Sequence, residues 1–295
     1  MEEKMNQKIT ELKEIIKLIT YNHTESEINL LTIASLSMIM LDDEIEDLLL
    51  EVLNKVPIYF TKDPLIDTYK RMVHNGVNRN ILSNLKYDTS AYFGFSINDS
   101  ELIDNRFMII SLEGPLWLIL DNLIHELKHA VNELITKYEC LHKETYFYSG
   151  LALAGQKSIL YEGIDEAFNS YLVKIYLKNI RLIKDLPIED EEIRELLNHF
   201  SIPSNYHYTY EKIVSECLPL FQSSKFFKLF YYGALYKDFN NLDEYLYKLF
   251  NNSLTSTEFF LKLDRYLKER SRTLELPKLV GKDLKSRVRI NPYLK

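Results

Sequence analysis

The sequence predicts a predominantly helical α+β protein, and three observations support this class. Glycine and proline number only eight each among 295 residues, which suits helices joined by short loops. Apolar residues recur at spacings of three and four over most of the chain, as on one face of a helix. Between about residues 83 and 112 this spacing gives way to aromatic and β-branched runs that are typical of strands. We expect a helical segment at residues 1–82, a core with a small antiparallel sheet at 83–175, and a second helical segment at 176–295.

The first segment carries four expected helices. Thr24 and Glu27 match a capping box, which marks the start of a helix just before a strongly apolar run. Pro57 closes the third helix, and the Asp63-Pro64 pair opens the fourth, because proline suits the first turn of a helix. The spacing of the apolar residues places these helices at residues 2–20, 28–41, 42–55 and 64–73.

Two strands are expected at residues 91–97 and 106–112, separated by a turn-forming stretch that favours antiparallel pairing. Gly114 and Pro115 end the second strand, and Pro115 fits the first turn of a following helix. That helix covers residues 116–135, where apolar residues recur at helical spacing. Glycines punctuate residues 145–155, which we interpret as a third strand or a hairpin.

The rest of the chain is expected to be helical. A helix at residues 158–173 would place Glu162 and Glu166 on one face, since residues four apart are neighbours on a helix. A basic tail without clear periodicity, at residues 278–295, is expected to be a loosely attached arm. Between them the apolar spacing predicts helices at residues 171–183, 189–200, 210–221, 225–236, 242–250 and 257–270.

Composition excludes several classes of function. A net charge of −7 argues against a nucleic-acid binder that works through bulk charge. The apolar runs are shorter than the roughly 18 residues that a membrane span needs, and the charged N-terminus lacks the apolar core of a secretory signal. Two cysteines, Cys140 and Cys217, are too few for a disulfide framework. We therefore expect a cytoplasmic protein that binds neither nucleic acid nor membrane.

One stretch indicates a chemistry by itself: residues 125–129 read His-Glu-Leu-Lys-His, an HExxH motif. On a helix, His125 and His129 lie on one face and could hold a metal ion between them. Glu126 could then act as general base toward a water on that metal. The alternative is an amphipathic core helix that happens to carry two histidines.

Catalytic zinc takes three protein ligands and keeps one position for water, so two imidazoles need a partner. A third histidine at the spacing HExxHxxGxxH is absent. A carboxylate is therefore expected as the third ligand.

With this pattern, the chain resembles the thermolysin-like, or glutamate-zincin, metallopeptidases over about residues 90–175. In that superfamily the third zinc ligand is a glutamate on a helix downstream of HExxH, and residues 161–168, Tyr-Glu-Gly-Ile-Asp-Glu-Ala-Phe, look like that helix. The Glu-Gly start implies Glu162 as the ligand, with Glu166 accepting a hydrogen bond from a ligand histidine. The Asp-Glu-Ala triplet implies the alternative, Glu166 as the ligand with Ser170 four residues on. Because Ser170 is a weaker orienter than a carboxylate, we expect Glu162 as the ligand.

The resemblance also implies a function: a zinc-dependent peptidase with a zincin-like core and a peptide or protein substrate. Zincins hold the oxyanion of the tetrahedral intermediate with a histidine or tyrosine, for which His207 and then Tyr206 are candidates. By the same analogy, the strand at residues 106–112 would be the edge strand that aligns an extended peptide. Two alternatives stay open, a metal-binding regulatory relative without peptidase activity and a helical interaction protein in which the motif is accidental.

Overall fold

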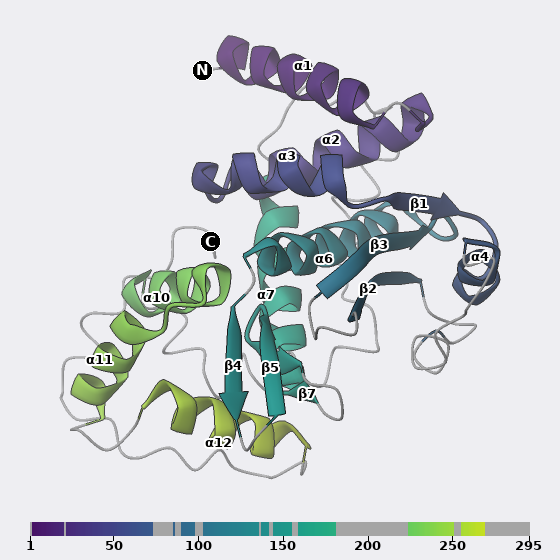
Figure 1. Cartoon of the computed structure of the whole chain (residues 1–295). Coiled ribbons are helices and arrows are strands. Elements are labelled where there is room, and N and C mark those ends of the chain that lie inside the picture. The colour runs from purple at the N-terminus through teal and green to yellow at the C-terminus, as the bar shows by residue number, and fades with distance from the viewer. Residues whose placement is uncertain are drawn as a thin grey trace. The chain divides into compact units, whose positions relative to one another are not determined.

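The computed structural model confirms a predominantly helical α+β fold (Figure 1). The chain divides into two compact units, residues 1–131 with 173–201 and residues 132–172 with 202–295. The division falls inside two helices, each of which is unbroken. The expected segment boundaries at residues 82 and 175 stay predictions. The structure describes residues 2–20, 22–72, 85, 90–97, 103–135, 137–141, 144–154, 159–180, 224–250 and 255–268.

The first unit begins with a helical hairpin of α1 (Glu2–Ile19) and α2 (Glu25–Ile39). The expected capping box is confirmed, because Glu27 N–H donates to Thr24 Oγ1 over 3.4 Å and Thr24 N–H donates to the Glu27 carboxylate over 2.7 Å. Almost every residue of α2 from Ile28 onward is buried, as expected for a helix that is apolar on all sides. The core of this unit therefore forms around α2.

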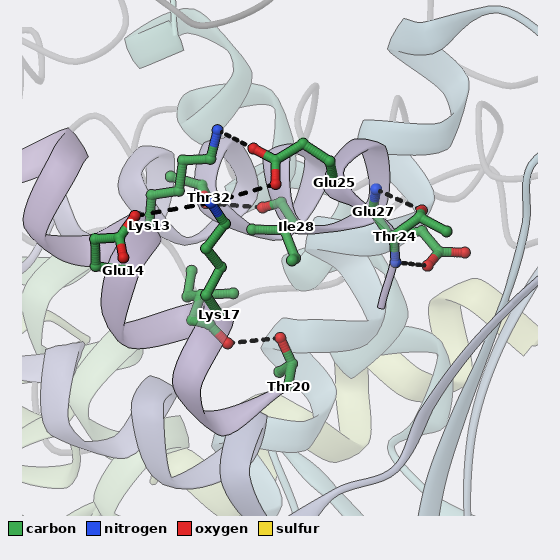
Figure 2. A network of polar contacts seen from close by, with 10 residues as sticks. Lys13, Glu14, Lys17, Thr20, Thr24, Glu25, Glu27, Ile28 and Thr32 are labelled. Carbon is green, nitrogen blue, oxygen red and sulfur yellow. Dashed lines mark hydrogen bonds and ion pairs between the residues drawn. The ribbon is translucent and has the colours of Figure 1, made fainter. Parts of the chain in front are cut away.

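A network of exposed charges joins the two helices of this hairpin (Figure 2). The Glu25 carboxylate pairs with the Lys13 ammonium at 2.5 Å and with the Lys17 ammonium at 3.3 Å. The hydrogen bond from Lys13, and then that from Lys17, holds the pKa of Glu25 below its usual value. Lys17 also lies 3.7 Å from Glu14. Such exposed pairs contribute little to the stability of the hairpin.

The expected third and fourth helices are also present. A short turn of 3₁₀ helix, η1 (Asp43–Ile45), precedes α3 (Glu46–Lys55), and the Asp42 carboxylate caps it by accepting the Glu44 N–H. The fourth helix is α4 (Leu65–Met72). Between α3 and α4 lies a strand that the sequence pattern did not indicate, β1 (Ile58–Thr61), which is only four residues long.

The sheet of the first unit has three strands in the order β1-β3-β2. The predicted antiparallel pair is confirmed as β2 (Ala91–Ile97) and β3 (Ile103–Ser111), with an irregularity between Gly94 and Ser96. Because β1 pairs with β3 in parallel, the sheet is mixed rather than antiparallel as predicted. β3 is the central strand, so the expectation that it is the edge strand is wrong. Among the described strands, β2 forms that edge of the sheet.

The HExxH helix is α6 (Leu116–Leu134), and it begins after Pro115 as predicted. The Pro115 carbonyl accepts the Leu118 N–H over 2.9 Å, which closes the first turn. The apolar positions that predicted the helix are buried with little or no exposed surface: Leu120, Leu123, Ile124, Leu127, Ala130 and Val131. The stripe sets the rotation of α6 and so fixes where its polar residues lie.

In the second unit, four short strands form an antiparallel sheet in chain order. The hairpin expected at residues 145–155 is confirmed as β5 (Glu144–Ser149) and β6 (Ala152–Ala154), flanked by β4 (Tyr138–Leu141) and β7 (Ile159–Leu160). The helix expected at residues 158–173 begins later and continues through the one expected at 171–183. Together they form a single helix, α7 (Glu162–Ile180).

The second unit also contains three C-terminal helices, α10 (Ser224–Tyr236), α11 (Asn240–Leu249) and α12 (Ser256–Lys268), as predicted. Aromatic rings of α10 contact the other two helices: the Phe226 ring lies 6.1 Å from Tyr245 of α11, and the Phe230 ring lies 5.7 Å from Phe260 of α12, between centroids. The helices expected at residues 189–200 and 210–221 and the tail at 278–295 lie outside the described residues. None of the described helices combines the length and the apolar character needed to cross a membrane.

Candidate metal centre

The two histidines of the motif face each other on α6. His125 Nε2 and His129 Nε2 lie 3.0 Å apart, and the ring centroids are 4.7 Å apart. His125 is buried, with 8% of its surface exposed. Two ligand atoms bound to one tetrahedral zinc ion at about 2.05 Å are separated by about 3.3 Å. The imidazole pair therefore has the spacing that a shared metal ion requires.

Glu166 on α7 supplies the third donor. One ligand atom from each of His125, His129 and Glu166 lies within 4.8 Å of the others, and this group could hold a metal ion. Two imidazoles and a carboxylate are a donor set that catalytic zinc takes. Glu166 is half-buried, whereas His125 is buried.

A hydrogen bond joins the end of α6 to α7, one turn further along each helix than His129 and Glu166. Asn132 Nδ2 donates to Asn169 Oδ1 over 3.5 Å, and both side chains are buried. Asn132 follows His129 by three residues on α6, and Asn169 follows Glu166 by three residues on α7. Residues three apart lie on the same helix face.

Of the two alternatives for the third ligand, the structure describes the side chain of Glu166 but not that of Glu162. Glu162 is the first residue of α7, and its side chain lies outside the described residues. Its role as a ligand stays a prediction. Glu166, the alternative ligand, is the carboxylate that the described side chains bring to the histidines. Ser170, expected four residues after that ligand, is buried in α7.

Glu126 contacts the edge strand of the first unit. The Phe93 N–H of β2 donates to Glu126 Oε2 over 2.8 Å. Ser111 N–H donates to the Ser90 carbonyl over 2.8 Å. In an antiparallel pair every second residue bonds to the neighbouring strand, so residues 90, 92 and 94 bond to β3. The backbone N–H of Phe93 therefore points away from β3, toward the open edge. Glu126 therefore satisfies an outward-facing backbone donor, and this bond fixes the carboxylate beside His125.

Sequence reasoning missed a group of buried polar residues next to the metal ligands. Asp165, Asn169, Asn132 and Lys237 are each no more than 3% exposed. Burial lowers the pKa of the Lys237 ammonium to about 7, although the charges of Asp165 and then Glu133 act in the opposite direction. The sequence offers one weak signal, a single lysine directly after the apolar run of α10. The two oxyanion candidates, His207 and Tyr206, lie outside the described residues.

Comparison with known proteins identifies no relative of this chain. No protein-family model, curated protein or solved structure matches the chain. The residues and geometry of the centre are therefore the whole basis for a functional assignment.

Proposed function

We propose that the chain is a zinc-dependent metallopeptidase in which His125, His129 and Glu166 hold the metal. The observation that carries the proposal is the grouping of these three donors, with Glu126 directly beside His125 on the same helix. A zincin-like arrangement of the core, a peptide or protein substrate and a cytoplasmic location are parts of the same proposal.

Zinc is the metal that suits this donor set. Imidazole and carboxylate ligands at one site, with three protein donors, are typical of catalytic rather than structural zinc. When bound, zinc would polarise a substrate carbonyl and bring the pKa of a bound water toward neutrality. The protein's contribution is to hold three donors on two helices and to bury one side of the centre.

Glu126 is the proposed general acid and base. Its carboxylate would take a proton from the attacking water and deliver it to the leaving amine, the role that a positioned carboxylate can perform in both directions. The hydrogen bond from Phe93 to Oε2 supports this role, because it restricts the orientation of the carboxylate. Proton transfer depends on such positioning.

The same hydrogen bond also favours a second candidate, a metal-binding regulatory or interaction protein without peptidase activity. In that case Glu126 would serve only to join α6 to β2 through Phe93. The histidine pair and Glu166 would bind metal equally well in both cases. The two candidates therefore differ only in whether the Glu126 carboxylate transfers a proton from the attacking water to the leaving amine.

Metal analysis combined with peptide hydrolysis tests the proposal. We would measure zinc per chain and cleavage of a mixed peptide library for the wild type, His125→Ala and Glu126→Gln. Glutamine keeps an oxygen that can accept the Phe93 N–H and removes the ability to carry a proton. We expect about one zinc in the wild type and in Glu126→Gln, little zinc in His125→Ala, and hydrolysis only in the wild type.

Each result separates the candidates. Hydrolysis retained by Glu126→Gln would contradict the proposed mechanism. Stoichiometric zinc without cleavage of any peptide would favour the regulatory candidate. Wild-type protein that takes up no zinc, even when zinc is added back, would remove both candidates and leave HExxH as an accident of a core helix.

A further inference from the structure

A continuous chain of buried hydrogen bonds connects the end of α10 with both helices that carry metal ligands. It begins at Lys237, directly after α10, and passes through the turn between β5 and β6 to Asp165 on α7. From Asp165 it continues to Asn169 and then to Asn132 at the end of α6. Every side chain in it is at least 97% buried.

The centre of this chain is the peptide group between Gly150 and Leu151. Lys237 Nζ donates to the Gly150 carbonyl over 3.2 Å, and the Leu151 N–H donates to Asp165 Oδ1 over 2.7 Å. One peptide plane is therefore held on both sides, by an amine and by a carboxylate. The amine of Lys237 also donates to the carbonyl of Ala234 in its own helix.

The backbone at Gly150 is shaped to allow this arrangement. Gly150 has a φ of +61°, which glycine adopts without strain. A Cβ at this position would lie 2.1 Å from Asp165 Oδ1 and 3.0 Å from Asn132 Nδ2. The turn approaches Asp165 and Asn132 so closely that only glycine fits.

Lys237 itself occupies an unfavourable backbone position. Its φ is +57°, in the left-handed region where the residue after a helix is commonly glycine. Burying an amine completely is also costly unless it is well bonded. A lysine that bears both costs indicates that its side chain, rather than its backbone, is what the position requires.

The other end of the chain reaches the metal ligands through the helix turns. Asp165 directly precedes Glu166, and Asn169 follows it by one turn. Asp165 Oδ2 accepts a hydrogen bond from Asn169 Nδ2 over 3.3 Å, and this bond spans the turn that carries Glu166. Asn169 Oδ1 then accepts the bond from Asn132, one turn after His129.

We propose that Lys237 is a positioning residue for the metal centre, acting through the Gly150–Leu151 peptide and Asp165 on the α7 turn that carries Glu166. This inference rests on the proposed metal site. Lys237 does not touch the metal or the substrate. It fixes the β5–β6 turn, which fixes Asp165, and the orientation of Asp165 sets that of the following turn of α7.

The test measures zinc affinity by competition with a chromophoric chelator, at a temperature where circular dichroism shows each metal-free variant to be folded. Lys237→Met keeps an unbranched side chain as far as Cε, with sulfur in place of Cδ, and lacks the amine. Lys248→Met is the matched control, because Lys248 is an exposed lysine on α11 that pairs with Glu244. We expect Lys237→Met to bind zinc roughly tenfold or more weakly, the loss typical of a residue that orients a ligand, and the control to bind like the wild type.

A second pair of variants decides the question even if Lys237→Met does not fold. Asp165→Asn removes the carboxylate charge and, in the observed orientation of the Asn169 amide, places two amide donors opposite each other. The double variant Asp165→Asn with Asn169→Asp restores a donor opposite an acceptor at each step. We expect zinc affinity, measured on the folded variants, to fall in the single variant and to recover in the double variant.

The outcomes separate this inference from the proposed function. Wild-type protein that binds no zinc removes the proposed function. Wild-type zinc binding that is unchanged in Lys237→Met, or in Asp165→Asn, overturns the positioning role and leaves the metal site standing. Loss in both with recovery in the double variant supports both proposals.

Discussion

Phe93 and Glu126 are joined by a hydrogen bond from the backbone of β2 to the carboxylate of α6, over 2.8 Å. The bond links the edge strand of the first sheet to the second residue of the HExxH motif. Glu126 therefore has a structural task that does not depend on any metal. Variants at this residue can separate the structural task from the chemical one.

We predict that Glu126→Ala destabilises the metal-free protein and that Glu126→Gln does not. Alanine leaves the Phe93 N–H without its acceptor, which should lower the free energy of unfolding by about 1 to 3 kcal/mol. Glutamine can still accept that bond. Urea unfolding in the presence of a chelator would measure both values. Equal stability of the two variants would show that the Phe93 bond contributes nothing to the fold.

The long helices and the antiparallel pair could be predicted because their signal is local. In α6, apolar residues recur over five turns, and Pro115 and the preceding glycine mark its start. β2 and β3 are runs of seven and nine residues with a turn-forming stretch between them. β1 and β7 have four and two residues, too few for any periodicity to appear. Their positions are set by pairing with distant strands.

The residues of the candidate site also divide into those that a local pattern predicts and those that distant contacts place. His125, Glu126 and His129 lie within one helix turn, so the motif and the helix together predict their arrangement. The choice between Glu162 and Glu166 depends on how α7 is placed along its axis, because both residues lie on one face. That placement is set by bonds such as that between Asn132 and Asn169, 37 residues apart in the chain. Lys237 and Gly150 are 87 residues apart, and no local pattern connects them.

We predict that Glu166→Ala lowers zinc affinity far more than Glu162→Ala does. Glu166 is the carboxylate grouped with the two histidines, and loss of a ligand should exceed the roughly 10- to 100-fold loss expected for a residue that only orients one. Chelator competition on both variants would give the two affinities. The reverse order would make Glu162 the ligand, as the Glu-Gly resemblance implies.

We predict that Gly150→Ala both destabilises the protein and weakens zinc binding. The new Cβ would meet Asp165 and Asn132 at distances that these side chains cannot accept without moving. Gly114→Ala is a suitable control, because Gly114 also has a positive φ, of +108°, but its added Cβ meets only the Leu118 side chain at 3.2 Å. Both variants should lose stability in thermal unfolding because of backbone strain.

Only the Gly150 variant should also lose zinc affinity, since only that position touches the buried chain of Asp165 and Asn132. Measuring affinity well below the unfolding temperature of each variant removes the contribution of stability. Equal zinc affinity in the two variants would show that the chain does not act on the metal centre.

The last prediction concerns the pH dependence of stability. Burial lowers the pKa of Lys237 to about 7 in the folded protein, from 10.5, while the charges of Asp165 and Glu133 partly oppose the shift. Between these two values the unfolded chain holds a proton at this amine that the folded protein has released. Stability rises with pH wherever the unfolded state binds more protons. Lys237 should therefore make the wild type more stable as pH increases from about 7 to about 10, by up to about 1.4 kcal/mol per pH unit.

Urea unfolding of the metal-free wild type and of Lys237→Met across this range would measure the effect. Other charged groups are close to Lys237: the carboxylates of Asp165 and Glu133 act on its amine, and the Lys137 ammonium donates to its carbonyl over 2.9 Å. Subtracting the curve of the Met variant isolates the contribution of the Lys237 amine, because the other groups remain in both proteins. We expect the difference, wild type minus variant, to increase with pH from about 7 and to level off only above the unfolded pKa of 10.5. Parallel curves would show that Lys237 keeps its proton throughout this range, as an ammonium fully stabilised by Asp165 and Glu133.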